Sequence, residues 1–478
     1  MSNPSPLKST GPADIRFEEG SFKDPDGRVF YHDGRVFRTL SAAAAERFET
    51  LFDEGHLERL IDRHLVIASW LVDSADIGLD PVALGAKVIE HRRIDVVTYP
   101  FEWSFDMLRD AALLTLDIIE RALAFDFILK DATPYNIGFV EAKPVLIDLL
   151  SLERHEAGAP WEGYAQYCRE FVFPLFFAAY RGIDFRVFFR GQLNGIELAT
   201  ASKVFSFWDL LRPGVWKHVK LQALLERTFR NSTVDVNESY RVGHFSKDAI
   251  LANMRNLRRT IETLPRPGAD SHWIDYGATH SYTADEQAAK VAFVEAMLER
   301  LRPRRVVDLG CNTGAYSVLA ASSAEQVIAI DLDSACVNDL YLAVRRKSIP
   351  NIVPLVGDLL NPSPAMGWML RERKSLFERI ESDAFLALAL VHHICIGGNV
   401  PVESFVGALG DIAPGGVVEW VDKSDPMVQF MLRNRADVFD GYTWQAFHAA
   451  LGARFDIIDI VEQKGGGRRL CMVAARDS

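Results

Sequence analysis

The chain has 478 residues, of which 49% are hydrophobic and 25% are charged, and its formal net charge is −12. This length predicts two to four domains, and the hydrophobic share excludes a chain that is disordered throughout. The acidic balance argues against a basic surface that extends over the whole molecule, so we expect no nucleic-acid partner.

The cysteines and the N-terminus indicate where the protein resides. The five cysteines form no Cys-x-x-Cys pair and no spacing typical of a metal site, so we expect neither a bound metal nor a disulfide framework. The first residues lack the apolar core of a secretory signal. The densest apolar run, Phe171–Tyr180, is too short to span a bilayer. We therefore predict a cytoplasmic protein without a transmembrane segment, preceded by a flexible head over residues 1–25.

The first predicted elements are short strands and helices. Residues 28–40 are typical of two strands around Asp33-Gly34, a hairpin turn, and residues 41–64 are typical of helix. Further strand candidates lie at Leu65–Leu71, Lys87–His91 and Asp95–Tyr99. A long amphipathic helix is predicted over Ser104–Phe125, because its apolar residues recur at helical spacing.

A polar loop and an apolar strand follow this helix. Asp131 and Asn136 are five positions apart, and Asp148 ends an apolar run. The pattern resembles the carboxy-terminal lobe of protein kinases and small-molecule phosphotransferases, over roughly residues 28–230. In that resemblance Asp131 positions an acceptor hydroxyl, while Asn136 and Asp148 hold magnesium beside a nucleotide.

The N-terminal half also departs from the phosphotransferase pattern. It has no Gly-rich phosphate loop and no Val-Ala-x-Lys strand, although Arg35 or Arg38 occupies that region, and Leu149-Leu150 replace Phe-Gly after Asp148. We therefore predict a kinase-like α+β domain over residues 26–263 that binds an acceptor or partner without catalysis. Magnesium-dependent phosphotransfer is one alternative, and a turn in which Asp131 only caps the chain is another.

Two stretches of this half have unusual compositions. Residues 171–189 contain 7 of the 30 phenylalanines, which predicts a helical core, with an apolar groove for a lipid or partner helix as the alternative. Residues 201–270 contain 12 basic and 7 acidic residues, a net charge of +5. That stretch is either a solvated helical face or a docking surface for an anionic partner. Prolines and a glycine within residues 264–271 predict a linker.

Residues 272–478 alternate between strands and helices. Helices are predicted at 284–301, 315–322 and 334–347, and strands at 304–310, 326–330, 351–356, 383–391, 416–421, 455–461 and 469–475. The alternation predicts a doubly wound parallel sheet, and the helix-free loop between the last two strands predicts an antiparallel hairpin. Ligands of such sheets bind beyond the carboxyl ends of the strands.

Polar groups and glycines follow the first three of these strands. Gly310 and Gly314 lie in the turn Asp308-Leu-Gly-Cys-Asn-Thr-Gly314, where the chain bends and a ligand can approach the backbone. Asp331 can accept hydrogen bonds from two ribose hydroxyls, and Asp358 can accept one from an adenine amino group. A dinucleotide domain is the alternative, but it would favour Gly-x-Gly-x-x-Gly.

This series resembles the class I S-adenosylmethionine-dependent methyltransferases. Asn312 stands where many members have a second glycine, and asparagine also adopts left-handed backbone angles. The resemblance implies that Asp308, Gly310, Asn312 and Gly314 belong to the S-adenosylmethionine site, with Gly310, Asn312 and Gly314 around the methionine part, Asp331 at the ribose and Asp358 at the adenine. It also implies a seven-stranded Rossmann-like sheet that ends in a hairpin.

Further residues are candidates for contact with the methyl acceptor. His392 and His393 follow the fourth strand and are catalytic candidates, as bases or as groups that only shape the pocket. Glu419, Asp422, Lys423 and Asp425 follow the fifth strand and either bind an acceptor or solvate a loop. Tyr276 and Tyr282 are candidates for a lid over the cofactor.

The whole chain resembles a two-part bacterial family of class I methyltransferases related to host-specific nodulation proteins. The segments that carry this resemblance are Ser104–Asn136, Val145–Glu153 and Ala384–Pro401. It implies a methyltransferase domain over 272–478, joined through residues 264–271 to a kinase-like recognition domain. The acceptor could be a small molecule, a sugar, a lipid-linked intermediate or a protein. A bifunctional methyltransferase and phosphotransferase, and a non-enzymatic cofactor-binding protein, are the alternatives.

Overall fold

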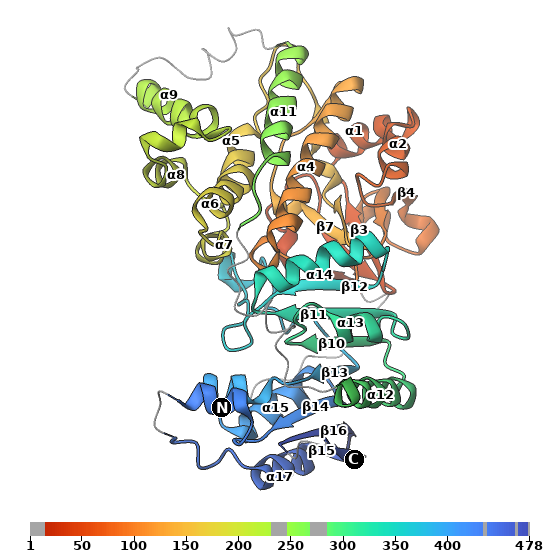
Figure 1. Ribbon diagram of the computed structural model, residues 1–478. Coiled ribbons are helices and arrows are strands. Elements are labelled where there is room, and N and C mark those ends of the chain that lie inside the picture. The colour runs from red at the N-terminus through yellow and green to blue at the C-terminus, as the bar shows by residue number, and fades with distance from the viewer. Residues whose placement is uncertain (1–14, 231–245, 268–283, 434–436, 464–466, 477–478) are drawn as a thin grey trace.

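The computed structural model describes residues 15–230, 246–267, 284–433, 437–463 and 467–476. Small sheets and many helices form the N-terminal half, and one large sheet with its helices forms the C-terminal half (Figure 1). Helix α14 (Ser334–Lys347) and strand β12 (Ile352–Val356) lie where the two halves meet (Figure 1). No helix of the described segments combines the length and the apolar character that crossing a membrane requires.

The N-terminal half opens with a five-stranded antiparallel sheet in the order β1-β2-β3-β5-β4. Its strands are β1 (Arg16–Phe17), β2 (Val29–His32), β3 (Arg35–Thr39), β4 (Ser69–Asp73) and β5 (Lys87–His91). The predicted hairpin is confirmed, with Asp33 and Gly34 at φ angles of 49° and 73°. The helices that connect and flank these strands are α1 (Ala42–Asp53), α2 (His56–Asp62) and α3 (Pro81–Leu84).

Three boundaries in this region differ from the prediction. The flexible head predicted over residues 1–25 extends too far along the chain, because Arg16 and Phe17 pair with β2. Strand β4 begins at Ser69, later than predicted. Asp95–Tyr99 is not a strand, because side chains take its backbone groups: the Val97 carbonyl accepts from Arg379 and the Tyr99 N–H donates to Glu102.

Helix α4 (Phe105–Ala122) is the centre of the N-terminal half, with 12 of its 18 residues buried. Two short antiparallel pairs lie beside it: β6 (Phe127–Leu129) with β9 (Leu152–Arg154), and β7 (Ile137–Val140) with β8 (Lys143–Leu146). The remaining helices are α5 (Tyr164–Tyr167), α6 (Phe173–Arg181), α7 (Arg186–Gly191), α8 (Leu198–Val204), α9 (Leu221–Arg230) and α11 (Lys247–Glu262). Phe171, Phe173, Phe176 and Phe177 are fully buried here, so the predicted helical core is confirmed.

The C-terminal half is a seven-stranded sheet in the order β12-β11-β10-β13-β14-β16-β15. The strands not yet given are β10 (Arg305–Leu309), β11 (Gln326–Asp331), β13 (Ala384–Ala387), β14 (Gly416–Val421), β15 (Phe455–Glu462) and β16 (Arg468–Ala475). The first five in chain order are parallel, and β16 is antiparallel to both of its neighbours. The predicted Rossmann-like doubly wound sheet with a terminal hairpin is therefore confirmed.

Helices cover this sheet, as the alternating sequence predicts. They are α12 (Ala284–Leu301), α13 (Ala315–Ala320), α14, α15 (Val402–Ile412), α16 (Pro426–Leu432) and α17 (Trp444–Arg454). The fourth strand is shorter than predicted, because β13 ends at Ala387 and the chain turns at Ala389, whose φ is 51°. His392 and His393 therefore lie at the start of a helical turn and not in the strand.

The two halves share one hydrophobic core, in which α4 packs against α14. Partly buried hydrogen bonds cross the contact: the Asn338 side chain donates to Asp106 at 2.9 Å, and the Tyr341 hydroxyl donates to Asp110 at 2.8 Å. Part of the predicted linker also contacts this interface, since Arg266 donates a hydrogen bond to Asp106 at 2.7 Å. Residues 268–271 lie outside the described part of the chain, and the division there stays a prediction.

Candidate functional site

The turn after β10 combines three left-handed residues. Gly310, Asn312 and Gly314 have φ angles of 77°, 51° and 80°. A Cβ added to Gly314 would clash with the Leu340 side chain, and the left-handed φ angle would strain any other residue there. Helix α13 begins directly after Gly314 and leaves its first N–H groups at the same edge of the sheet. The sequence therefore forms a tight turn at the end of a central strand.

Asp331, at the end of β11, holds this turn. Its Oδ2 accepts the N–H of Asn312 at 2.8 Å, and its Oδ1 accepts the N–H of Asp333 at 2.8 Å. Burial raises the pKa of the Asp331 carboxyl, although these backbone donors oppose the shift. A carboxylate has about four lone-pair positions, so each oxygen keeps acceptor capacity for a further donor.

Asp308 lies behind the turn rather than at its surface. It is 2% exposed, and its Oδ2 accepts from the Ser317 hydroxyl at 2.6 Å. Burial raises its pKa to about 6, with the nearby Asp331 adding to the shift. This carboxyl therefore ties β10 to α13.

Asp358 follows the third strand of the C-terminal half, as its sequence position predicts. Its Oδ1 accepts the N–H of Leu360 at 2.9 Å, and it is partly exposed. The preceding Gly357 donates its N–H to the Asp331 carbonyl at 2.9 Å. Leu332, next to Asp331, is 62% exposed, so an apolar side chain accompanies these two carboxylates.

The strand order reverses between β10 and β13, and this is where α/β sheets bind ligands. The turn at Gly310 and the loop after β13 flank this point and touch each other, because a Cβ on Gly310 would lie 3.3 Å from Leu390 Cδ1. The loop is fixed from β14, since Glu419 Oε2 accepts the N–H of Ala389 at 2.9 Å. His392 and His393 follow in the same loop, with ring centroids 4.1 Å apart.

A buried network of charges supports this loop. Glu419 accepts from Lys290 Nζ at 2.6 Å and from Arg468 Nη1 at 3.4 Å, and Arg468 Nε donates to Asp425 at 2.8 Å. All four side chains are less than one-tenth exposed. The predicted acidic cluster therefore divides: Glu419 and Asp425 join the network, whereas Lys423 pairs at the surface with Asp437 and Asp422 accepts from Ser424.

The sequence prediction missed Lys290 and Arg468. Lys290 lies three to four positions before Phe293 and Val294, on the apolar face of its predicted helix. A lysine in such a stripe indicates a buried ion pair, because a charge is rarely buried without a partner. Arg468 gives no comparable signal, since its partners come from β14 and from the start of α16, which are distant in sequence.

Two buried polar side chains at this edge lack partners among the described residues. Neither ring nitrogen of His392, which is fully buried, has a hydrogen-bond partner, and neither polar atom of the Gln463 side chain has one. Burial, with His393 and Arg468 adding to it, holds the pKa of His392 well below its usual range. Burial likewise lowers the pKa of His393 to about 4. Both imidazoles are therefore neutral at pH 7.

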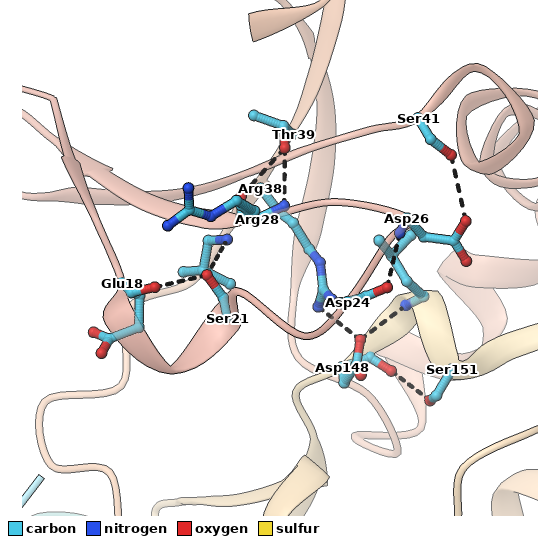
Figure 2. A network of polar contacts seen from close by, with 12 residues as sticks. Glu18, Ser21, Asp24, Asp26, Arg28, Arg38, Thr39, Ser41, Asp148 and Ser151 are labelled. Atoms are coloured by element: carbon cyan, nitrogen blue, oxygen red, sulfur yellow. Dashed lines mark hydrogen bonds and ion pairs between the residues drawn. The ribbon is translucent and has the colours of Figure 1, made fainter. Parts of the chain in front are cut away.

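The N-terminal half has its own polar centre, around Asp148 (Figure 2). Arg38, from β3, donates to Asp148 Oδ1 at 2.6 Å and forms a second ion pair with Asp24. Asp131 is near them: burial raises its pKa, and the charges of Asp148 and Asp24 add to the shift. Glu170 accepts from Thr133 at 2.6 Å, inside the Asp131–Asn136 loop, and burial raises its pKa to about 7.

Asp131 and Asp148 are near enough for their charges to interact, and Asp148 also pairs with a guanidinium. The kinase-like interpretation of this half stays a prediction. Tyr276 and Tyr282 lie outside the described residues.

Comparisons with known proteins place the chain in a family. The chain is 36% identical to the nodulation protein NoeA of Rhizobium meliloti (strain 1021) over 447 residues, which cover 92% of each chain. Among solved structures, it is similar to the N-methyltransferase NodS from Bradyrhizobium japonicum WM9, with 10% identity, 41% of this chain and 99% of NodS covered, and a TM-score of 0.29.

A magnesium protoporphyrin IX methyltransferase, ChlM from Synechocystis PCC 6803 with bound SAH, has 16% identity, with 40% of this chain and 84% of that chain covered and a TM-score of 0.28. No protein-family model matches the sequence. Because the likeness to NoeA spans nearly the full length of both proteins, this chain belongs to the NoeA family.

Proposed function

We propose that this protein is an S-adenosylmethionine-dependent methyltransferase, with its cofactor bound over the Gly310–Gly314 turn. The observation that carries the proposal is the hydrogen bond from the Asn312 N–H to the Asp331 carboxylate, beside the point where the strand order reverses. That hydrogen bond fixes the left-handed turn, and the Asp331 carboxylate can still accept further hydrogen bonds. Both features suit a ligand that has hydroxyl donors and a charged amino-acid end.

The residues present fit this cofactor. Asp331 suits the ribose hydroxyls, partly exposed Asp358 suits the adenine amino group, and Leu332 offers an exposed apolar side chain for a ring face. The first N–H groups of α13 suit a carboxylate. Asp308 acts indirectly, because its bond to Ser317 holds α13 against β10. When bound, S-adenosylmethionine supplies a methyl group on a sulfonium, so positioning of the acceptor provides much of the catalysis.

We place the acceptor atom beside His392 and His393. A neutral, buried imidazole without a partner can accept a hydrogen bond from a hydroxyl or amine and so orient that acceptor toward the methyl group. Gln463 offers a second unused donor and acceptor at the same edge. The Lys290–Glu419–Arg468 network then has a positioning role, since Glu419 fixes the loop that carries the histidines.

For the N-terminal half we propose recognition of the acceptor or of a partner rather than phosphotransfer. Arg38 already forms an ion pair with Asp148, the carboxylate that would hold magnesium in a phosphotransferase. The shared core and the bonds from Asp106 and Asp110 to α14 would couple this half to the catalytic half. If phosphotransfer did occur, ATP with magnesium should raise the melting temperature, and Asp148→Ala should abolish the effect.

Calorimetry with S-adenosylhomocysteine tests the cofactor site. We expect binding to the wild-type protein and a loss of about 100-fold or more in Asp331→Ala, since two hydroxyl bonds to a charged group contribute about 3 kcal/mol or more. Asp339→Ala is the control, because Asp339 is exposed on the neighbouring helix α14. An unchanged affinity in Asp331→Ala, or no binding to folded protein at millimolar ligand, would refute the proposal.

Turnover distinguishes an enzyme from a cofactor-binding scaffold. Labelled methyl transfer from S-adenosylmethionine into fractionated lysate should mark one fraction. We expect His392→Leu to lose the transfer while it keeps its affinity for S-adenosylhomocysteine. Binding without transfer into any fraction would favour the non-enzymatic alternative.

A further inference from the structure

A segment of the N-terminal half exposes four large apolar side chains within ten residues. Phe207, Trp208 and Leu211 lie in a 3-10 helical turn and are 75%, 76% and 86% exposed, and Trp216 in the next turn is 51% exposed. Residues three apart eclipse each other in a 3-10 helix, so Trp208 and Leu211 project from one face. The Phe207 ring lies 5.8 Å from the Trp208 ring. These side chains therefore form one apolar surface.

The inner side of the same segment is firmly anchored. Asp209, which is 3% exposed, accepts from the backbone N–H and the hydroxyl of Ser206 at 2.6 and 2.8 Å. It also forms ion pairs with Arg181 and Arg212. Val215 is fully buried. The buried polar bonds thus fix the backbone of the segment, which carries the exposed aromatic side chains.

The segment is also basic, in an acidic protein. Residues 198–221 contain four basic residues and one acidic residue, the buried Asp209, whereas the whole chain carries −12. Lys203 and Lys217 are exposed beside the apolar side chains. Lys217 donates to the neutral Asn256 at 3.2 Å, and Lys203 has no ion-pair partner within the described segments. Within residues 198–221, the exposed charges beside the apolar side chains are therefore all basic.

We propose that this aromatic-basic patch (Lys203, Phe207, Trp208, Leu211, Trp216 and Lys217) docks the protein on a membrane surface that contains anionic phospholipids. Tryptophan, phenylalanine and leucine insert at the boundary between headgroups and acyl chains, and lysines pair with lipid phosphates. A flat surface can reach the patch, because α8 and α9, on either side of it in sequence, lie at the outer margin of the molecule (Figure 1).

Vesicle sedimentation with the full-length protein tests the proposal. We expect binding to phosphatidylcholine vesicles that contain phosphatidylglycerol, and little binding to pure phosphatidylcholine. The combined Phe207→Ser, Trp208→Ser and Leu211→Ser variant should lose this binding. The double variant Lys203→Gln, Lys217→Gln should bind about 30-fold more weakly, at about 1 kcal/mol for each lysine.

Trp368, Met369 and Leu370 provide a matched control, because they are 67%, 69% and 67% exposed in another 3-10 turn. Basic residues beside that turn are already paired with acids, as in Lys374 with Glu18. Serine at these three positions should leave vesicle binding unchanged. Equal loss in both triple variants, equal binding to neutral vesicles, or a self-association that the patch variant abolishes would overturn the proposal. Circular dichroism confirms that each variant is folded.

Discussion

The N-terminal polar centre and the carboxyl edge of the large sheet both contain clusters of charged side chains. The two regions differ in how many buried polar groups lack hydrogen-bond partners. Around Asp148, a guanidinium from β3 pairs with two carboxylates, and of these three side chains only the Arg38 Nε lacks a hydrogen-bond partner among the described residues. At the sheet edge, the network around Glu419 is also paired, yet His392 and Gln463 beside it have no partners among the described residues. Buried polar groups without partners cost free energy, so they point to a ligand more strongly than charge alone does.

Glu419→Ala should produce the largest effect on stability. It removes the carboxylate that Lys290 and Arg468 share, and it leaves two cations buried without their central partner. Breaking a buried ion pair costs about 3–5 kcal/mol. Thermal and denaturant unfolding should therefore show a large loss, whereas Glu295→Ala, at an exposed position of α12, should change little. A loss below that of an exposed ion pair would contradict the assigned role of the network.

Asp308→Asn should change how stability depends on pH. The pKa of Asp308 is about 6 in the fold and 3.8 ordinarily, so the folded state binds the proton more tightly than the unfolded state. Ionisation of Asp308 should therefore lower the free energy of unfolding of the wild type by about 3 kcal/mol as pH rises from about 4 to about 6. The neutral amide of Asp308→Asn cannot ionise, so this pH-dependent loss should disappear in the variant. Asparagine can still accept the Ser317 hydroxyl.

The measurement for Asp308 is the difference in melting temperature between variant and wild type at several pH values. The melting temperature of the variant should rise relative to that of the wild type between about pH 4 and about pH 6, and the difference should stay constant at higher pH. Asp411→Asn is the control, since the Asp411 side chain is 81% exposed. A difference that does not vary with pH would show that the carboxyl is not strongly shifted.

Arg38→Met tests whether the Arg38 guanidinium takes the place of a metal cation in the N-terminal centre. Asp24 and Asp148 would lose their shared cation, at a cost of about 2 kcal/mol, between the values for exposed and buried pairs. Millimolar magnesium should then raise the melting temperature of the variant but not of the wild type, because the two carboxylates would attract a replacement cation.

Arg35→Met provides the comparison for Arg38, because Arg35 pairs with Glu90 at an exposed position of the same strand. Arg35→Met should lower the free energy of unfolding by less than about 1 kcal/mol, and magnesium should not raise its melting temperature. Equal stabilisation of wild type and Arg38→Met by magnesium would mean that the centre binds a cation with Arg38 in place, and the phosphotransferase alternative would gain support.

Local patterns predicted the parts of the fold that depend on short stretches of sequence. The glycines at 310 and 314 and the strand that ends at Asp331 mark the turn, because left-handed angles and strand ends have local signatures. The contact between Glu419 and Ala389 joins residues 30 positions apart, so the end of β13 was predicted too late. Asp95–Tyr99 has the composition of a strand, but side chains from distant segments take its backbone groups. The partners of Arg468 depend on tertiary packing in the same way.

His392→Leu should have the smallest effect on stability, and for that reason it is the most informative variant. Both ring nitrogens of His392 are buried without partners, so an apolar side chain of similar size removes two unsatisfied groups and should leave stability within about 1 kcal/mol of wild type. His91 in the N-terminal half is the matched contrast, because it is also buried but its Nδ1 bonds to the Ser69 hydroxyl at 2.8 Å. His91→Leu breaks that bond and should cost about 1–2 kcal/mol. If methyl transfer is lost in His392→Leu while stability is kept, the imidazole is retained for a ligand and not for the fold. If His392→Leu destabilises the protein as much as His91→Leu does, the imidazole contributes to the fold, and the acceptor must be sought elsewhere along the sheet edge.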